Sequence, residues 1–264
     1  MDKKLLLFDL DDTLLTTEKI ITPHTVEAIQ TCKSKGMFIG YITGRARPFY
    51  DEMFFTDKYN LPCDFIAYYN GAEICAGGTS SESMESNVIS YDHAMKMIRS
   101  LIAIYPDIKI GVINEPWSYS MKSGDNWNRE TGEKVKWDIF ELPRYDVQRM
   151  HVVFDKIGEI PLNNFMTEET IFFINVNNTA MVVNKNATKE HALMKAAGYF
   201  NIPLSGVIAF GDDINDIEML KTAGIGVAMG NAIAAVKDIA DFVTETNDNE
   251  GISVWINKYL LNKK

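Results

Sequence analysis

A short apolar run near the amino terminus ends in a cluster of acidic residues. Leu5–Phe8 has the length and composition of a buried strand, and Asp9, Asp11 and Asp12 follow it. Carboxylates crowded at the end of a buried strand repel one another and lose hydration, so they need a nearby cation or a shared proton. In an open α/β sheet, this end of the strand is also where ligands bind. The run therefore predicts a metal-assisted site that contains a carboxylate nucleophile or base.

The remaining chain alternates strand-like and helix-like segments, with one long interruption. The alternation covers residues 1–81 and returns in 185–264, which predicts a Rossmann-like, doubly wound parallel sheet. Residues 82–184 contain several strand-like segments that alternate in polarity, as strands of an antiparallel sheet do. We therefore expect a core domain formed by 1–81 and 185–264, and an inserted α+β domain formed by 82–184.

Three further polar groups lie at strand ends or helix starts of the alternating part. Thr43-Gly44-Arg45 closes the second strand, where a hydroxyl and free backbone N–H groups can hold phosphate oxygens. Lys189 begins a helix after the insert, and a later strand ends in Gly211-Asp212-Asp213-Ile214-Asn215-Asp216. Taken singly, Thr43-Gly44 also fits a helix cap and Lys189 a surface lysine. The acidic cluster of Asp9, Asp11 and Asp12 by itself also fits a solvated turn.

In this order, the four groups resemble the motifs of the haloacid dehalogenase superfamily. The first motif of that family, hhhDxDxT, is matched by Leu6–Thr13, and its Thr or Ser is matched by Thr43. Its lysine is matched by Lys189, and its acidic GDxxND motif by Gly211–Asp216. The Thr43-Gly44-Arg45 run and the Asn70-Gly71-Ala72 run look most like the Cof-type subfamily. The long insert after the second motif resembles the C2 cap, which implies that the insert closes over the core and selects the substrate.

The resemblance implies a Mg²⁺-dependent phosphatase that works through an aspartyl-phosphate intermediate. Asp9 would be the nucleophile, and Asp11 would protonate the leaving oxygen and then activate water. Asp9, the main-chain carbonyl of Asp11 and Asp212 would bind Mg²⁺, and Asp216 would orient these ligands from behind.

The remaining site residues would bind the phosphoryl group. Lys189 would offset negative charge on the nucleophile and on the phosphoryl oxygens, which Thr43, Gly44 and Asn215 would also bind. Arg45 is a candidate substrate ligand, with a surface ion pair as the equal alternative. For Asn70 the resemblance gives a place near the site but no role, and Asp12 is expected to be solvated.

Two alternatives to hydrolysis stay open from the sequence. One is a phosphotransferase or phosphomutase on the same scaffold, in which the phosphoryl group passes to a second hydroxyl. The other is a non-catalytic regulator that binds a metabolite and retains the fold.

Composition narrows the class of partner. The formal net charge of −10 argues against nucleic acid or an anionic membrane as the main partner. The chain has no apolar run long enough to span a bilayer. Its three cysteines lack metal-ligand spacing and fit reduced thiols in the cytoplasm. We expect a cytoplasmic monomer or small homo-oligomer whose partner is a small phosphorylated metabolite.

Overall fold

The computed structural model divides the chain into two compact units, Met1–Glu85 with Thr188–Lys264, and Ser86–Ala187. The residues it describes are 3–47, 59–77, 83–114, 117–120, 135–136, 144–153, 160–174 and 179–261. In these ranges, no helix is both long and apolar enough to cross a membrane.

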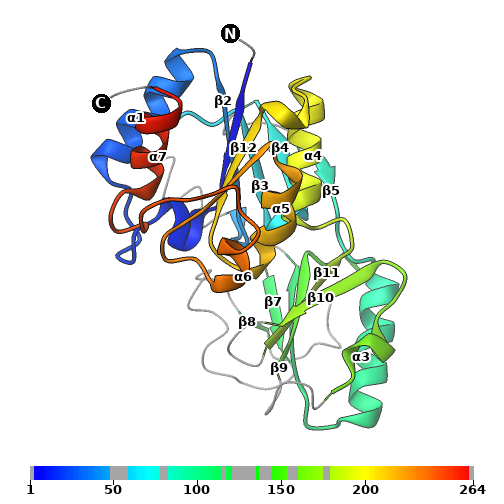
Figure 1. The fold of residues 1–264 in the computed structure, drawn as a ribbon. Helices are drawn as coiled ribbons and strands as arrows, with labels where there is room; N and C mark the ends of the chain where they lie inside the picture. The colour runs from blue at the N-terminus through cyan, green and yellow to red at the C-terminus, as the bar shows by residue number, and fades with distance from the viewer. Residues whose placement is uncertain are drawn as a thin grey trace. The chain divides into compact units, whose positions relative to one another are not determined.

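The first unit is built on an eight-stranded sheet with the order β14-β13-β12-β1-β2-β3-β4-β5 (Figure 1). Its strands are β1 (Leu5–Phe8), β2 (Phe38–Ile42), β3 (Phe65–Tyr68), β4 (Glu73–Ala76), β5 (Ser83–Ser86), β12 (Val207–Gly211), β13 (Ile225–Ala228) and β14 (Phe242–Val243). Its helices are α1 (Pro23–Ser34), α4 (Lys189–Tyr199), α5 (Ile217–Thr222), α6 (Ala234–Lys237) and α7 (Gly251–Tyr259). The strands from β14 to β3 run parallel, and β4 runs antiparallel to β3.

Helices cover both faces of this sheet, which explains why its central strands are apolar on both sides. Every residue of β1 and β12 is buried, as expected for parallel strands with helices on either face. In Figure 1, α1 and α7 lie on one face and α4 and α5 on the other. Across the central pair, the rings of Phe8 and Phe210 stack with their centroids 5.0 Å apart. The sequence also marks the start of α1, because the Thr22 side chain caps the Thr25 N–H and Pro23 takes the first helical position.

The connectivity of the sheet reverses at β1. From β1 the chain moves to β2 and β3 on one side, whereas β12, β13 and β14 follow one another on the other side. In doubly wound sheets, ligands bind at the carboxyl ends of the strands where the order reverses. The acidic cluster after β1 therefore lies at the switch point of the sheet.

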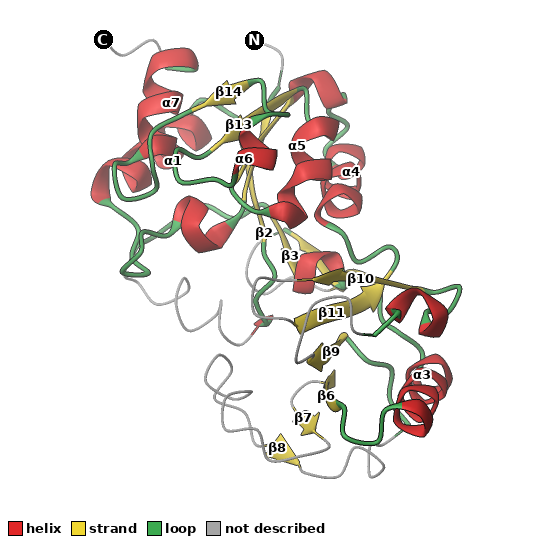
Figure 2. Cartoon of the chain, turned by 60° about the horizontal axis from the view of Figure 1, so that its bottom comes forward, coloured by secondary structure: helices red, strands yellow, loops and turns green. Residues whose placement is uncertain are grey.

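The second unit is a six-stranded sheet with the order β10-β11-β9-β6-β7-β8. Its elements are α3 (Tyr91–Ile104), β6 (Lys109–Asn114), β7 (Trp117–Ser120), β8 (Val135–Lys136), β9 (Arg149–Val153), β10 (Thr170–Ile174) and β11 (Thr179–Asn184). Neighbouring strands are antiparallel except for β7 and β8. The helix α3 packs beside this sheet (Figure 2), and its buried residues share a core with Ile110, Met150 and Val182.

The structure confirms a doubly wound α/β core interrupted by an α+β insert. One strand differs from the expected arrangement, because β5 continues the sheet of the first unit although its residues fall within the predicted insert. The short, polar β5 carries no apolar pattern that assigns it to either sheet. The division into a catalytic core, 1–81 with 185–264, and a substrate-selecting insert, 82–184, stays a prediction. Residues 78–82, at the first boundary between them, lie outside the described ranges.

Candidate active site

Two neighbouring parallel strands bring the first and fourth sequence groups together. Asp9 follows β1, and its N–H donates to the carbonyl of Phe210 in β12, 3.1 Å away. Asp212 follows the last residue of β12. The carboxyl ends of β1 and β12 therefore place both aspartates at the same edge of the sheet.

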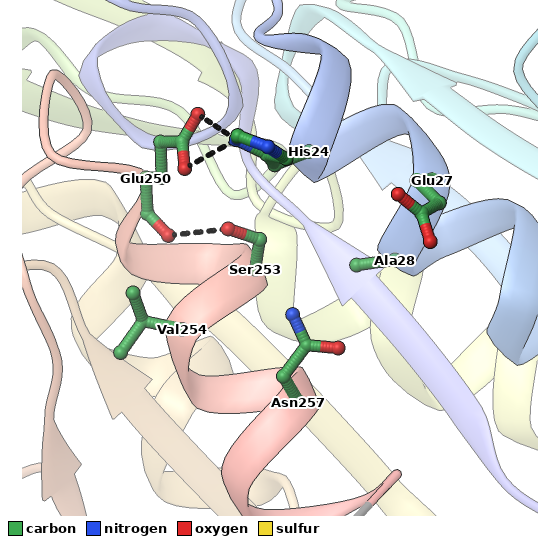
Figure 3. A pocket seen from close by; sticks show the side chains of 7 residues that line it. All are labelled: His24, Glu27, Ala28, Glu250, Ser253, Val254 and Asn257. Carbon is green, nitrogen blue, oxygen red and sulfur yellow. Dashed lines mark hydrogen bonds and ion pairs between the residues drawn. The ribbon is translucent and has the colours of Figure 1, made fainter. Parts of the chain in front are cut away.

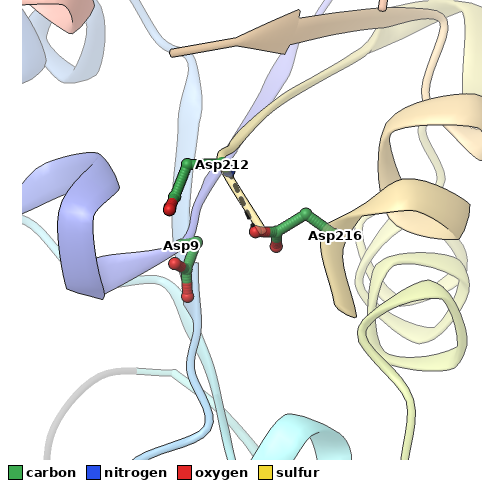
Figure 4. Close-up of side chains that lie close together, drawn as sticks. All are labelled: Asp9, Asp212 and Asp216. Atoms are coloured by element: carbon green, nitrogen blue, oxygen red, sulfur yellow. Dashed lines mark hydrogen bonds between the residues drawn. The ribbon is translucent and has the colours of Figure 1, made fainter. Parts of the chain in front are cut away.

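Three carboxylates converge at this edge (Figure 4). Asp9, Asp212 and Asp216 each offer one oxygen, and these oxygens lie within 4.8 Å of one another. Asp9 is 5% exposed and Asp216 fully buried, whereas Asp212 is half-buried. Oxygen ligands at this spacing, with one partly exposed member, fit a hard divalent cation such as Mg²⁺ that keeps some of its water.

Lys189 is the buried cation of this cluster. Its Nζ lies 2.6 Å from Asp9 Oδ1 and 2.7 Å from Asp216 Oδ1, and its side chain is 1% exposed. Burial opposes the charged amine, but Asp216 and Asp9 outweigh it, so the pKa of Lys189 is raised and the amine stays protonated. One cation facing two carboxylates leaves negative charge in the cluster that a metal ion can neutralise.

Asp216 holds the backbone of the loop that carries Asp212. Its Oδ2 accepts hydrogen bonds from the N–H groups of Asp212 and Asp213 at 3.0 and 3.1 Å. Gly211 makes this possible, because a Cβ atom there would lie 2.5 Å from Cγ of Asp216. Glycine at position 211 is thus required sterically for the Asp216 side chain to reach its place.

The crowding of carboxylates perturbs their protonation. Burial is the main reason that the pKa of Asp9 is raised well above its usual range, and Lys189 offsets this only in part. Burial likewise raises the pKa of Asp212 to about 7; the hydroxyl of Thr13, 2.6 Å away, opposes this rise and the charge of Asp216 adds to it. Both carboxylates are therefore poised to lose a proton when a cation binds.

This crowding predicts how the metal-free protein responds to pH. Between about pH 4 and pH 7, native Asp212 keeps a proton that the unfolded chain loses, so the contribution of Asp212 to stability should fall as pH rises through this window. Asp212→Asn should weaken this fall and raise the melting temperature at pH 7.5 in metal-free buffer. It should also reduce the stabilisation that added Mg²⁺ gives.

Thermal melting over this pH range, with and without Mg²⁺, checks the expectation. Asp213→Asn is the matched control, since this exposed neighbour caps Ile214 N–H through an oxygen that asparagine retains. Equal melting curves for the wild type and Asp212→Asn would contradict an acidic cluster that repels itself.

Asp11 lies apart from the three converging carboxylates and is bound by two cations. The guanidinium of Arg45 donates to both of its carboxylate oxygens, and Lys19 Nζ lies 3.1 Å from Oδ1. Burial acts to raise the pKa of Asp11, but Arg45 and Lys19 outweigh it and lower the pKa below its usual value. Arg45, predicted either to reach the substrate or to pair at the surface, is thus paired with a predicted catalytic residue.

The second sequence group forms a loop that is tied to the end of β3. Oγ1 of the buried Thr43 accepts from Arg45 N–H at 3.0 Å, and the Thr43 carbonyl accepts from Asn70 N–H at 2.7 Å. Gly44 lies beside the Asn70 side chain, because a Cβ on Gly44 would be 3.3 Å from Asn70 Oδ1. Asn215 reaches this oxygen as well, at 3.1 Å from its Nδ2. The predicted phosphate ligands thus gather around Asn70.

Sequence reasoning did not assign three of these contacts. It placed Thr13 in the first motif but did not predict its hydrogen bond to Asp212, and it assigned no role to Asn70. Lys19 was not identified, because a single lysine in the segment between Asp9 and α1 has no distinguishing pattern. The Asn70-Gly71 pair did carry a signal, since asparagine followed by glycine is typical of left-handed backbone.

A separate hollow of about 290 Å³ lies between α1 and α7 (Figure 3). His24 Nδ1 and Glu250 Oε1, which both line it, are hydrogen-bonded at 2.9 Å. The hollow is lined by none of the residues of the four sequence groups, but by His24, Glu27, Ala28, Glu250, Ser253, Val254 and Asn257. The candidate active site is therefore the edge of the sheet and not this hollow.

Comparisons of sequence and of structure with known proteins point to one family. The model of the haloacid dehalogenase-like hydrolases matches residues 6–256. The 5-amino-6-(5-phospho-D-ribitylamino)uracil phosphatase YcsE of Bacillus subtilis is 28% identical over 99% of this chain and 97% of its own.

Solved structures agree with this result. BT1666 of Bacteroides thetaiotaomicron, described among phosphatases of the same superfamily, superposes with a TM-score of 0.83 at 27% identity, covering 97% of this chain and 95% of its own. The subclass IIB sugar phosphatase BT4131 gives a TM-score of 0.80 at 26% identity, over 97% of this chain and 98% of its own. These findings confirm the predicted enzyme class, a phosphatase of the hydrolase type. The chain belongs to the haloacid dehalogenase-like hydrolase family, as a member similar to its Cof-type, subclass IIB phosphatases.

Proposed function

We propose that this protein hydrolyses small phosphate monoesters through an aspartyl-phosphate on Asp9, with Mg²⁺ as its cofactor. One observation carries the proposal: Asp9, at the switch point of the sheet, lies beside a buried lysine and two further carboxylates. A carboxylate with a lysine at 2.6 Å and room for a cation is equipped to approach a phosphate dianion.

The proposed metal ligands are residues already gathered at the sheet edge. Asp9, Asp212 and the main-chain carbonyl of Asp11 would hold Mg²⁺, and Asp216 would orient the loop of Asp212 through its two backbone hydrogen bonds. When bound, the ion supplies positive charge between the nucleophile and the phosphoryl oxygens.

The proposed reaction has two displacements at phosphorus. Asp9 attacks in line and forms the Asp9–phosphorus bond, while the ester oxygen leaves with a proton from Asp11. Asp11 then takes a proton from water, which attacks phosphorus, releases inorganic phosphate and restores the Asp9 carboxylate. Lys189 stabilises charge on Asp9 and on the phosphoryl oxygens in both steps.

The contacts of Asp11 support its role as the base that takes a proton from water. Arg45 and Lys19 lower its pKa, so in the free protein Asp11 is ionised, which is the form that accepts a proton from water. The first step needs the protonated form. A phosphoryl dianion bound nearby raises the pKa of a carboxyl group by like-charge repulsion, and this supplies the change that the first step requires.

The phosphoryl oxygens would be bound by the loop at the end of β2 and by the loop after β12. We assign this role to Thr43, Gly44 and Asn215, which the structure gathers around Asn70. Arg45 remains a candidate substrate ligand. To bind the substrate, it would give up its hydrogen bonds to Asp11. We assign the choice of substrate to the second unit, which is inserted between the Thr43 and Lys189 groups.

The substrate class is proposed from the names of the relatives. One relative is named for a phosphorylated ribitylamino-uracil and another as a sugar phosphatase. We therefore propose a phosphorylated sugar, a sugar-like polyol or a phosphorylated cofactor as the substrate.

A phosphate-release screen with Mg²⁺ and no added acceptor tests the proposed function. The panel contains sugar phosphates, nucleotides, flavin mononucleotide and pyridoxal phosphate, with an EDTA-treated sample as the control. We expect inorganic phosphate from at least one ester, and loss of this release with EDTA. Phosphate transfer that requires a sugar acceptor would show a phosphotransferase instead, and tight binding without turnover would show a binding protein.

A further inference from the structure

Asn70 has an unusual combination of backbone conformation and burial. It follows β3 with φ +60° and ψ 17°, in the left-handed region, and is only 1% exposed. Asparagine tolerates this backbone, but connecting segments of this kind usually run over the protein surface. In this chain, Asn60 and Asn201 also have positive φ angles and are both exposed.

The Asn70 side chain is only half satisfied. Its Oδ1 accepts from Asn215 Nδ2 at 3.1 Å, whereas its buried Nδ2 has no hydrogen-bond acceptor among the described residues. A buried donor without an acceptor costs stability, so a side chain selected only to form a turn would be better exposed or replaced by glycine. The single bond that the side chain does make is to a proposed phosphate ligand.

The main chain of Asn70 is tied to the other phosphate loop. Its N–H donates to the Thr43 carbonyl at 2.7 Å, and a Cβ on Gly44 would lie 3.3 Å from its Oδ1. Asn70 therefore joins the loop after β2 to Asn215 in the loop after β12. Both loops belong to the first unit, so this link is internal to the core.

We infer that Asn70 is a positioning residue for phosphoryl binding, acting through the carboxamide of Asn215. By accepting one N–H of Asn215 Nδ2, it fixes the rotation of that amide, and the second N–H is left for a phosphoryl oxygen. The inference rests on the proposed function, because it assumes that Asn215 binds the phosphoryl group.

A double-mutant cycle tests this inference. Asn70→Gly keeps the left-handed backbone and removes the side chain, and Asn215→Ala removes the proposed ligand. Each single change should lower kcat/KM roughly tenfold or more, as expected for the loss of a directed hydrogen bond to a charged group. The double variant should lose no more than Asn215→Ala alone, because both changes remove the same interaction. The dissociation constant of inorganic phosphate, measured by calorimetry, should follow the same pattern.

Controls separate a positioning role from a structural one. Asn201→Gly makes the same substitution at an exposed residue with φ +53°, and should leave kcat, KM and phosphate binding unchanged. If the losses in transition-state stabilisation of the two single variants add up fully in the double variant, the inference is overturned. A wild type that releases no phosphate from any ester would instead overturn the proposed function, and phosphate calorimetry would still measure the coupling.

A measurement on the unmodified protein avoids any dependence on folding of the variants. In ¹⁵N NMR spectra, the bond between Asn215 Nδ2 and Asn70 Oδ1 predicts one slowly exchanging proton in the Asn215 side-chain amide. Both protons exchanging at the rate of a free amide would contradict the bond, and with it the inference.

Discussion

Asp9→Asn should abolish phosphate release, lowering kcat by roughly 10³-fold or more, as the loss of a covalent nucleophile does in other enzymes. Asparagine has the same shape as aspartate but is a far weaker nucleophile towards phosphorus. The change also removes one charge from the crowded carboxylates, so the protein should stay folded. Steady-state release of phosphate from the best ester of the panel gives the rate, and circular dichroism confirms the fold.

Asp12→Asn provides the matched control for this variant. Asp12 lies three residues further along the same run, its side chain is 52% exposed, and its φ of +58° suits asparagine. Its variant should keep wild-type turnover within about twofold, because its ion pair with Lys19, at 3.2 Å, is solvent-exposed and such pairs contribute little. Full activity in Asp9→Asn, or an equal loss in both variants, would show that Asp9 is not the nucleophile.

Lys189→Met should reduce both stability and activity, because it removes the cation between two buried carboxylates. Methionine matches the length of lysine but leaves Asp9 and Asp216 without their partner at 2.6 and 2.7 Å. Breaking a buried ion pair from one side costs about 3–5 kcal/mol of the free energy of unfolding. The loss should be smaller at low pH, because Asp9, whose pKa burial already raises, then takes up a proton. Urea denaturation in metal-free buffer at pH 5 and pH 8 measures both effects.

Lys195→Met is the control on the same helix. Lys195 is 45% exposed and pairs with Glu85 at 2.6 Å, so its loss should change stability by less than about 1 kcal/mol. If Lys189→Met were no less stable than Lys195→Met at pH 8, the buried lysine would not be holding the carboxylates together.

The sequence was sufficient to predict the fold class because the signals were local. Strands such as Leu5–Phe8 are short apolar runs bounded by polar residues, and α1 begins with a capping threonine followed by proline. Parallel strands end at the same edge of a sheet, so the polar groups that follow them could be expected to meet. The strand β5 could not be assigned, because its four largely exposed positions, three of them polar, carry no periodic apolar signal.

The residues that form the site could be predicted better than the contacts between them. That Asp9, Asp212, Asp216 and Lys189 lie together followed from motif order and strand ends, and the structure brings them together. The pairing of Arg45 with Asp11 joins two strand ends, and its geometry depends on side-chain conformations that no spacing encodes. The same holds for the bond between Asn70 and Asn215, which are distant in the sequence.

The stereochemical course at phosphorus tests the central claim most directly. A phosphorothioate monoester made chiral with oxygen isotopes is hydrolysed with Mg²⁺, and the configuration of the released thiophosphate is determined. Two in-line displacements, first by Asp9 and then by water, each invert phosphorus, so the account predicts overall retention. Overall inversion would mean that water attacks the ester directly, and would contradict an aspartyl-phosphate on Asp9.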